Sequence, residues 1–169
     1  KAAVAAGYGA LKLKLTADAA ADDARLRAVR GAVGPGVALR GDANGAWTPR
    51  AAIERLRGLA AYDLAYVEQP VAAADLDGLA RVRRASDVPI AADEALLWPA
   101  GPGIAAVLAA EAADVVVLKP ALLGGPTAAR AAALAAAGRG VGVTVRTSLD
   151  AAVGRHTALA VAAALDAAP

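Results

Sequence analysis

Six short apolar runs alternate with alanine-rich stretches along the whole chain, and this alternation limits the fold more than any other feature. The apolar runs are residues 10–15, 37–40, 64–67, 88–92, 115–118 and 141–145. Helices are expected over about residues 18–32, 48–60, 73–85, 102–112, 125–138 and 150–166. Strands that alternate with helices form a parallel sheet with right-handed crossovers. The sequence therefore predicts an α/β protein built from six βα units.

A polar or ionisable residue ends every apolar run, at intervals of 25 to 29 residues: Lys14, Asp42, Glu68, Asp93, Lys119 and Ser148. This regularity favours a TIM-type (β/α) barrel, because the carboxyl ends of barrel strands converge on one mouth. A closed barrel has about eight strands, so we expect an incomplete barrel, a single partial domain over residues 1–169. The alternative is a doubly wound sheet, which usually carries a glycine-rich phosphate loop. Gly124-Gly125 is too short for such a loop.

The composition excludes several classes of protein. The absence of cysteine excludes a disulfide framework, a thiolate zinc site and a cysteine nucleophile. No apolar run reaches the roughly 18 residues of a membrane span, and no signal-peptide pattern opens the chain. The net charge is only +2, and arginines are scattered along the expected helices without interleaved aromatic residues. We therefore expect a cytoplasmic protein that binds neither membrane nor nucleic acid; a homo-oligomer is compatible with the sequence.

Three acidic residues, Asp42, Glu68 and Asp93, end successive strands and are expected side by side on the rim of the mouth. Like charges held this close repel each other unless a cation lies between them. Oxygen ligands favour a hard ion, so the pattern predicts a Mg²⁺ site in which Mn²⁺ could substitute. The alternative is three solvated carboxylates with no shared role.

Two polar residues beyond these acids could orient the ligands. They are Asn44, for which turn formation with Gly45 is an equal alternative, and Gln69. Glu94 adjoins Asp93, but the period-two alternation of a strand predicts that it points to the other side. Asp93 is therefore the expected ligand of the two.

Lysine is rare in this chain: of 18 basic residues only four are Lys, and three of these lie at ends of apolar runs. Arginine cannot give up its proton in a protein, whereas lysine can act as a base. Lys12 and Lys14 are two residues apart on one strand, so both point into the barrel, where their mutual repulsion favours loss of one proton. Lys119 lies four strands away, on the opposite side of the acids. The alternative is that these lysines are ordinary surface side chains.

Five motifs, taken together, resemble the muconate-lactonizing-enzyme subgroup of the enolase superfamily. They are K-x-K at 12–14, R-G-D-A-N at 40–44, Y-V-E-Q-P at 66–70, A-D-E at 92–94 and L-K-P at 118–120 followed by L-L-G-G. The resemblance implies Mg²⁺ on the three acids and removal of a proton next to a substrate carboxylate, with stabilisation of the enediolate. It implies that Lys14 is the principal base or acid, Lys12 an electrostatic helper and Lys119 the group on the opposite face. The family's N-terminal capping domain is not found in this sequence.

Residues 146–154 resemble the corresponding segment of o-succinylbenzoate synthases, which catalyse a dehydration in menaquinone biosynthesis. By this resemblance Ser148 contacts the succinyl tail of the substrate, although a helix N-cap role is an equal alternative. N-succinylamino acid racemase is the nearest alternative activity, followed by dipeptide epimerase and cycloisomerase. A non-catalytic barrel or binding module stays open as a different class. The single histidine, His156, falls inside the last expected helix and is expected to be structural.

Overall fold

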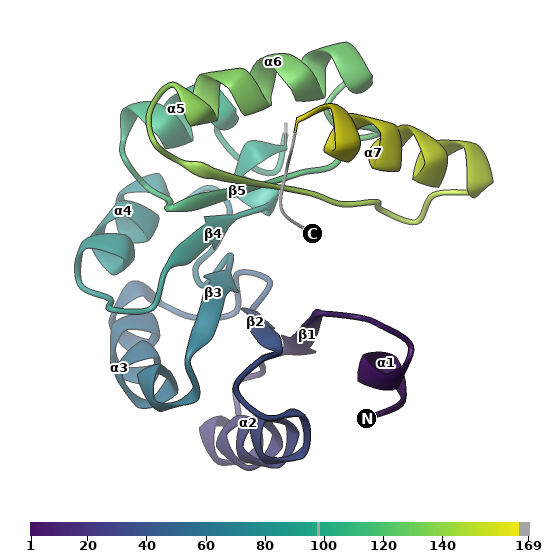
Figure 1. Ribbon diagram of the computed structural model, residues 1–169. Helices are drawn as coiled ribbons and strands as arrows, with labels where there is room; N and C mark the ends of the chain where they lie inside the picture. Colours follow the sequence, from purple (N-terminus) through teal and green to yellow (C-terminus); the bar gives the residue numbers. More distant parts are fainter. Residues whose placement is uncertain (98, 166–169) are drawn as a thin grey trace.

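A computed structural model describes residues 1–97 and 99–165. Six parallel strands form one sheet in strict chain order, and the sheet curls into an open arc with the helices outside (Figure 1). The strands are β1 (Ala10–Lys14), β2 (Ala38–Asp42), β3 (Leu64–Glu68), β4 (Ile90–Ala92), β5 (Val115–Leu118) and β6 (Gly142–Val145). This confirms the expected incomplete barrel, because a doubly wound sheet would reverse its strand order.

The helices follow the strands as expected, with one extra short helix at the start. They are α1 (Ala2–Ala5), α2 (Ala19–Val33), α3 (Pro49–Leu59), α4 (Leu76–Arg84), α5 (Ile104–Ala109), α6 (Pro126–Ala137) and α7 (Ala152–Ala164), with the 3-10 helices η1 (Ala60–Tyr62) and η2 (Glu94–Leu96). The Asp18 side chain accepts hydrogen bonds from two amides at the start of α2, and Thr48 does so once for α3. Gly34, with φ of 75°, ends α2. These caps explain where the helices begin and end.

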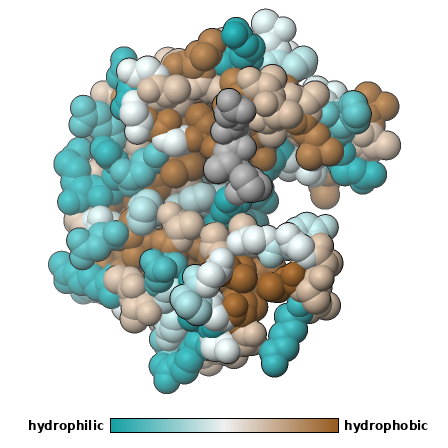
Figure 2. Space-filling view, in the orientation of Figure 1, coloured by the Kyte–Doolittle hydropathy of each residue, from teal (hydrophilic) through white to brown (hydrophobic). Residues whose placement is uncertain are grey.

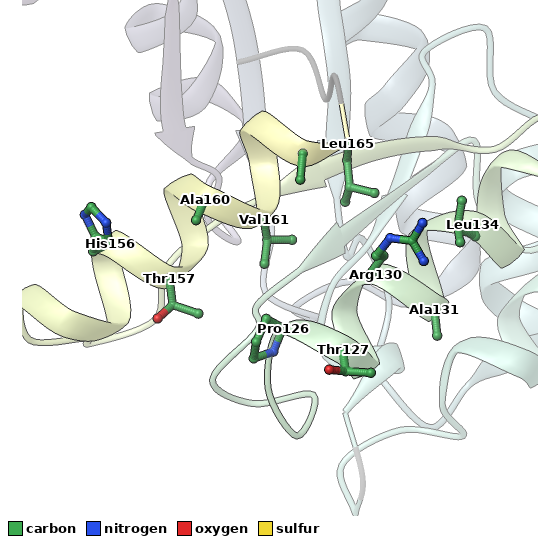
Figure 3. A pocket seen from close by; sticks show the side chains of 11 residues that line it. Pro126, Thr127, Arg130, Ala131, Leu134, His156, Thr157, Ala160, Val161 and Leu165 are labelled. Atoms are coloured by element: carbon green, nitrogen blue, oxygen red, sulfur yellow. The ribbon is translucent and has the colours of Figure 1, made fainter.

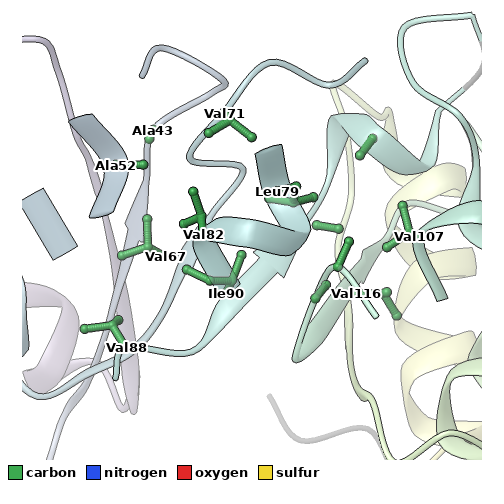
Figure 4. Packing of buried hydrophobic residues seen from close by; sticks show 14 of the residues in the cluster. Ala43, Ala52, Val67, Val71, Leu79, Val82, Val88, Ile90, Val107 and Val116 are labelled. Atoms are coloured by element: carbon green, nitrogen blue, oxygen red, sulfur yellow. The ribbon is translucent and has the colours of Figure 1, made fainter. Parts of the chain in front are cut away.

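The hydrophobic core lies between the outer face of the sheet and the surrounding helices (Figure 4). Val67, Ile90 and Val116 from three strands are fully buried there. Leu79 from α4 and Val107 from α5 belong to the same cluster. Each fully buried aliphatic side chain stabilises the fold by about 1.5–3 kcal/mol, so the core holds the strands in place without any phenylalanine.

The inner face of the arc carries charged side chains at its β1 and β2 end. The strand register aligns Lys12 with Arg40, and Arg40 with Tyr66. The Arg40 guanidinium lies 5.2 Å from the centre of the Tyr66 ring. Together with Arg146, these residues line a cavity of about 120 Å³. The inward positions of β1 and β2 therefore provide charge, while Tyr66, Ala91 and Val117 on β3 to β5 form a second, small hydrophobic cluster.

The surface differs between the two ends of the arc. In the space-filling view, hydrophilic residues dominate the outer side around α3 and α4, while hydrophobic residues gather on the arm that carries α6 and α7 (Figure 2). Leu134, Val153 and Leu159 are exposed on these two helices. Within residues 1–97 and 99–165, no helix combines the length and apolar character needed to cross a bilayer.

Candidate active site

Three acidic side chains lie at the carboxyl ends of neighbouring strands. Asp42 and Glu68 are the last residues of β2 and β3, and the register pairs them directly. Asp93 follows β4, in which Ala91 pairs with Glu68. The relative exposures of the three acids are 0%, 0% and 2%. Neighbouring strands are about 4.8 Å apart, so the fold brings the three predicted ligands to one buried rim.

Lys12 and Lys119 neutralise acids on this rim. Lys12 on β1 donates a hydrogen bond to Asp42 and also lies 3.5 Å from Glu68. Lys119, directly after β5, donates to Asp93. Buried carboxylates are stable only when they are paired. The strands of the two lysines are four places apart in the sheet, so the acids lie on the strands between them, as predicted.

Arg146 is a site residue that the sequence analysis did not identify. It follows β6 directly, and one of its guanidinium nitrogens donates to both oxygens of Glu68, at 2.8 and 2.7 Å. The signal for it was present, because Arg146 lies 27 residues after Lys119, within the interval of the other strand ends. Ser148 was taken as the strand end in its place.

The pKa values of Asp42 and Glu68, which pair in the strand register, shift in opposite directions. Burial raises the pKa of Glu68 to about 7, and the nearby Asp93 and Asp42 add to this rise. The positive charges of Arg146 and Lys12 offset part of it. Burial also raises the pKa of Asp42, but hydrogen bonds from two lysines outweigh it and leave that pKa below its usual value. Of these two acids, Glu68 is thus the one that takes up a proton more readily.

A chain of hydrogen bonds holds Lys14 on the rim. Its amine donates to Asp42 at 2.7 Å and to the side-chain oxygen of Asn44. The Asn44 amide in turn donates to Glu94 at 2.8 Å. The prediction that Glu94 points away is wrong, because β4 ends at Ala92 and Glu94 begins η2, where strand alternation no longer applies. Glu94 therefore belongs to the site.

Gln69 holds the segment that carries Asp93. It is completely buried, its amide donates to the Val71 carbonyl at 2.9 Å, and its oxygen accepts from the amides of Asp93 and Ala95, both at 3.1 Å. Its φ of 41° is in the left-handed region, as is that of Asn44 at 46°. Such backbone strain is found where the surrounding structure fixes a site. Asn44 is thus both a turn residue and a contact of Lys14, while Gln69 fixes the backbone of Asp93.

Ser148 lies in the loop after β6. Its hydroxyl donates to Asp150 at 2.7 Å. The alternative of a helix N-cap is wrong, because α7 begins at Ala152 and its N-cap is Ala151. Contact of Ser148 with a substrate stays a prediction. His156 lies within α7 and not at a strand end, as expected, and its side chain is exposed.

A groove of about 580 Å³ lies between α6 and α7 (Figure 3). Its lining is mainly apolar and includes His156, Val161 and Leu165. None of the acids or lysines of the rim contributes to it. The groove is therefore separate from the candidate active site.

The donor set of the rim suits a hard cation. In the part of the chain that the structure describes, no three acidic, histidine or cysteine side chains are placed so that they could hold a metal ion together. Each acid of the rim is instead bonded to a basic group. One oxygen of Asp93, Oδ1, is buried and accepts no hydrogen bond. A buried carboxylate oxygen without a donor, beside two further carboxylates, fits an oxygen-binding ion such as Mg²⁺.

Known proteins resemble this chain in sequence and in fold. Over 108 residues it is 51% identical to an o-succinylbenzoate synthase from Thermobifida fusca, covering 64% of this chain and 33% of that enzyme. The dipeptide epimerase from Enterococcus faecalis, solved in complex with Mg and the dipeptide L-Leu-L-Tyr, has a TM-score of 0.87 and 32% identity, covering 95% of this chain and 45% of that one. N-succinyl Arg/Lys racemase from Bacillus cereus has a TM-score of 0.86 and 29% identity, covering 95% and 43%.

The chain thus spans less than half the length of these relatives. Residues 1–169 match the family described as "Enolase C-terminal domain-like" over their full length. The parallel half-barrel, the acids on adjacent strand ends and the relatives agree with this match. The resemblance to the enolase superfamily is therefore confirmed, and the chain belongs to the Enolase C-terminal domain-like family.

Proposed function

We propose that the protein is a Mg²⁺-dependent enzyme that removes a proton next to a substrate carboxylate, with residues 1–169 as one partial barrel domain. The observation that carries this proposal is the arrangement of the rim. Lys14 ends β1, Lys119 follows β5, and three buried acids end the strands between them. A small carboxylate bound at the acids would have one amine on each side.

Asp42, Glu68 and Asp93 are the residues that would hold Mg²⁺, and Gln69 would keep Asp93 in place. Bound Mg²⁺ would stabilise the negative charge that develops on the substrate carboxylate as the α-proton leaves. The unpaired Asp93 oxygen and the oxygen-only donor set support this ligand assignment.

Lys14 is proposed as the base that takes the α-proton. Its amine is held at the rim by Asp42 and Asn44, and its side chain is 61% exposed, so a substrate could reach it. Lys12 is more buried and paired with Asp42, so it is suited to supplying charge rather than moving a proton. Lys119 would lie against the other face of the substrate.

Among reactions of this kind, we favour the dehydration that forms o-succinylbenzoate, a cytoplasmic step of menaquinone biosynthesis. The 51% identity to the Thermobifida fusca synthase supports this choice. In that reaction Lys119 would act as a cation over the developing aromatic ring. Racemisation of N-succinylamino acids is the second candidate, because two lysines on opposite faces suit removal of a proton on one face and its return on the other.

The test is an absorbance assay of the full-length protein with 2-succinyl-6-hydroxy-2,4-cyclohexadiene-1-carboxylate, with Mg²⁺ or with EDTA. We expect conversion to o-succinylbenzoate that EDTA abolishes. The variant Asp42→Asn should lose at least about 100-fold in Mg²⁺ affinity, more than the loss of an outer partner of a ligand costs, and turnover with it. Turnover that is unchanged by EDTA would exclude the metal mechanism. No conversion by a folded, Mg²⁺-loaded protein would move the proposal to racemisation.

A further inference from the structure

Arg146 pairs with Glu68, a predicted metal ligand. A bound metal ion would compete with Arg146 for this carboxylate. Its guanidinium donates to both oxygens of Glu68, which is completely buried. The two residues are 78 positions apart in the chain, and their strands β3 and β6 are three places apart in the sheet. The ion pair therefore crosses the inside of the arc rather than following one strand pair.

Arg146 differs in kind from the lysines of the rim. An arginine keeps its charge at every accessible pH, so it cannot act as a proton acceptor. Its planar group donates to both oxygens of one carboxylate. Mg²⁺ would bind the same carboxylate oxygens directly. The guanidinium and the metal would therefore compete for Glu68.

The geometry around Arg146 allows its side chain to leave without unfolding the strand. Its backbone amide donates to the Leu118 carbonyl at 2.8 Å, which ties the chain to β5. Its side chain, in contrast, is 29% exposed and lines the cavity of about 120 Å³ on the inner face. Rotation of the side chain alone would free Glu68.

We infer that Arg146 is an internal counter-ion: it holds the Glu68 carboxylate in place while no metal is bound and is displaced when Mg²⁺ binds. This inference rests on the metal site of the proposed function. A buried carboxylate is destabilising unless its charge is compensated, and Arg146 compensates the ionised Glu68 at shorter range than Lys12, which lies 3.5 Å away. The metal must then break the pair, and Arg146 weakens Mg²⁺ binding while it stabilises the metal-free protein.

The test compares Arg146→Met with Arg83→Met in the full-length protein. Arg83 pairs with Asp114 at 2.7 Å and its side chain is 31% exposed, which matches Arg146, but it lies on α4 away from the rim. Mg²⁺ affinity is measured by calorimetry, and the midpoint of thermal unfolding is measured in EDTA and in saturating Mg²⁺. Arg146→Met should bind Mg²⁺ about tenfold more tightly, within the range for outer contacts of a metal site.

In EDTA, Arg146→Met should unfold about 5 °C below the wild type, and Mg²⁺ should remove most of this difference. Arg83→Met should lose stability equally in both conditions, with an unchanged affinity for Mg²⁺. If Arg146→Met does not fold, Arg146→Lys, which keeps one charge but not the planar donor group, should show a smaller gain in affinity. If Arg146→Met binds Mg²⁺ no more tightly than the wild type, the counter-ion role of Arg146 is wrong, while the proposed metal site stands. A wild type that binds no Mg²⁺ would overturn the metal site and the inference together.

Discussion

A lysine at the end of a strand is useful as a base only if its amine is held where the proton leaves. Lys14 reaches over the rim and is held by Asp42 and Asn44. Glu94 accepts a hydrogen bond from the amide nitrogen of Asn44. This contact keeps the amide oxygen of Asn44 turned towards Lys14. Single residues of the site therefore act through chains of contacts, and substitutions should separate the groups that react from those that position them.

The substitution Lys14→Arg keeps a positive charge at this position. Arginine stays protonated, so it cannot accept the α-proton as the neutral amine of lysine can. We expect Lys14→Arg to lower turnover by about 10²–10⁴-fold, the range that a general base contributes. Lys119→Arg should keep most of a synthase activity, in which the group acts as a cation, but should abolish a racemase activity. The measurements are turnover and the incorporation of solvent deuterium at the α-carbon. Near-normal rates in Lys14→Arg would show that another group is the base.

Glu94→Gln should act on Lys14 through Asn44. The neutral amide accepts a weaker hydrogen bond than a carboxylate, so Asn44 loses its fixed orientation. We expect kcat to fall about tenfold while KM and the thermal midpoint stay near their wild-type values, as for outer contacts of a site. Glu54→Gln is the matched control, because Glu54 is exposed on α3 and pairs only with Arg50 in the described structure. Equal kcat values for Glu94→Gln and the wild type would remove Glu94 from the positioning chain.

At the scale of elements, Arg30 joins the end of α2 to two loops. Its guanidinium donates to the carbonyls of Gly34 and Val37 before β2 and of Tyr62 and Asp63 before β3, at 2.7 to 3.1 Å. Removing one donor group leaves several carbonyls without partners at once. The side chain therefore helps to fix where both strands start.

Arg30→Met should lower the free energy of unfolding by about 2–4 kcal/mol, because a hydrogen bond from a charged group contributes about 1.5–3 kcal/mol and several are lost. Urea denaturation followed by circular dichroism measures this change. Arg27→Met, on the same helix, is the control: the Arg27 side chain is 75% exposed and contacts Asp23 and Tyr62, so solvent can replace these contacts and its loss should hardly change stability. Equal stability of the two variants would contradict the role given to Arg30.

The elements were predictable from the sequence to within a few residues, because strand periodicity, caps and glycines act locally. Thr48 caps the start of α3 and Gly34 ends α2, within two residues of the expected boundaries at 48 and 32. The errors arose where a local rule was carried past the end of an element. Glu94 was assigned by strand alternation after β4 had already ended. The pairing of Arg146 with Glu68 depends on how far the sheet curls, which no local pattern in the chain encodes.

At the scale of the whole molecule, curvature of the sheet determines which charges meet. Strands β1 and β5 are four places apart, yet Lys12 and Lys119 pair with acids of the same rim. Arg146, directly after β6, pairs with Glu68 on β3. The acids and the cations that pair with them form one network that crosses the arc. Changes in pH or metal concentration should therefore alter the stability of the whole fold and not of one strand only.

Glu68 gives this network a defined pH dependence. Burial raises its pKa from 4.5 to about 7, so between these values the folded state binds more protons than the unfolded state. By linkage, the metal-free protein loses stability as pH rises through this window. Mg²⁺ binds only the ionised carboxylate. Binding therefore competes with the proton at pH 6 and hardly at pH 8.

We expect the affinity for Mg²⁺ to be about tenfold weaker at pH 6 than at pH 8, because one pKa unit corresponds to a factor of ten. The rise in thermal midpoint on adding a fixed concentration of Mg²⁺ should be correspondingly larger at pH 8. Calorimetry in two buffers of different ionisation enthalpy should detect one proton released per ion at pH 6. Glu68→Gln should bind Mg²⁺ weakly and without this pH dependence. An affinity that is the same at both pH values would show that Glu68 is already ionised at pH 6, with Arg146 stabilising its charge more than burial opposes it.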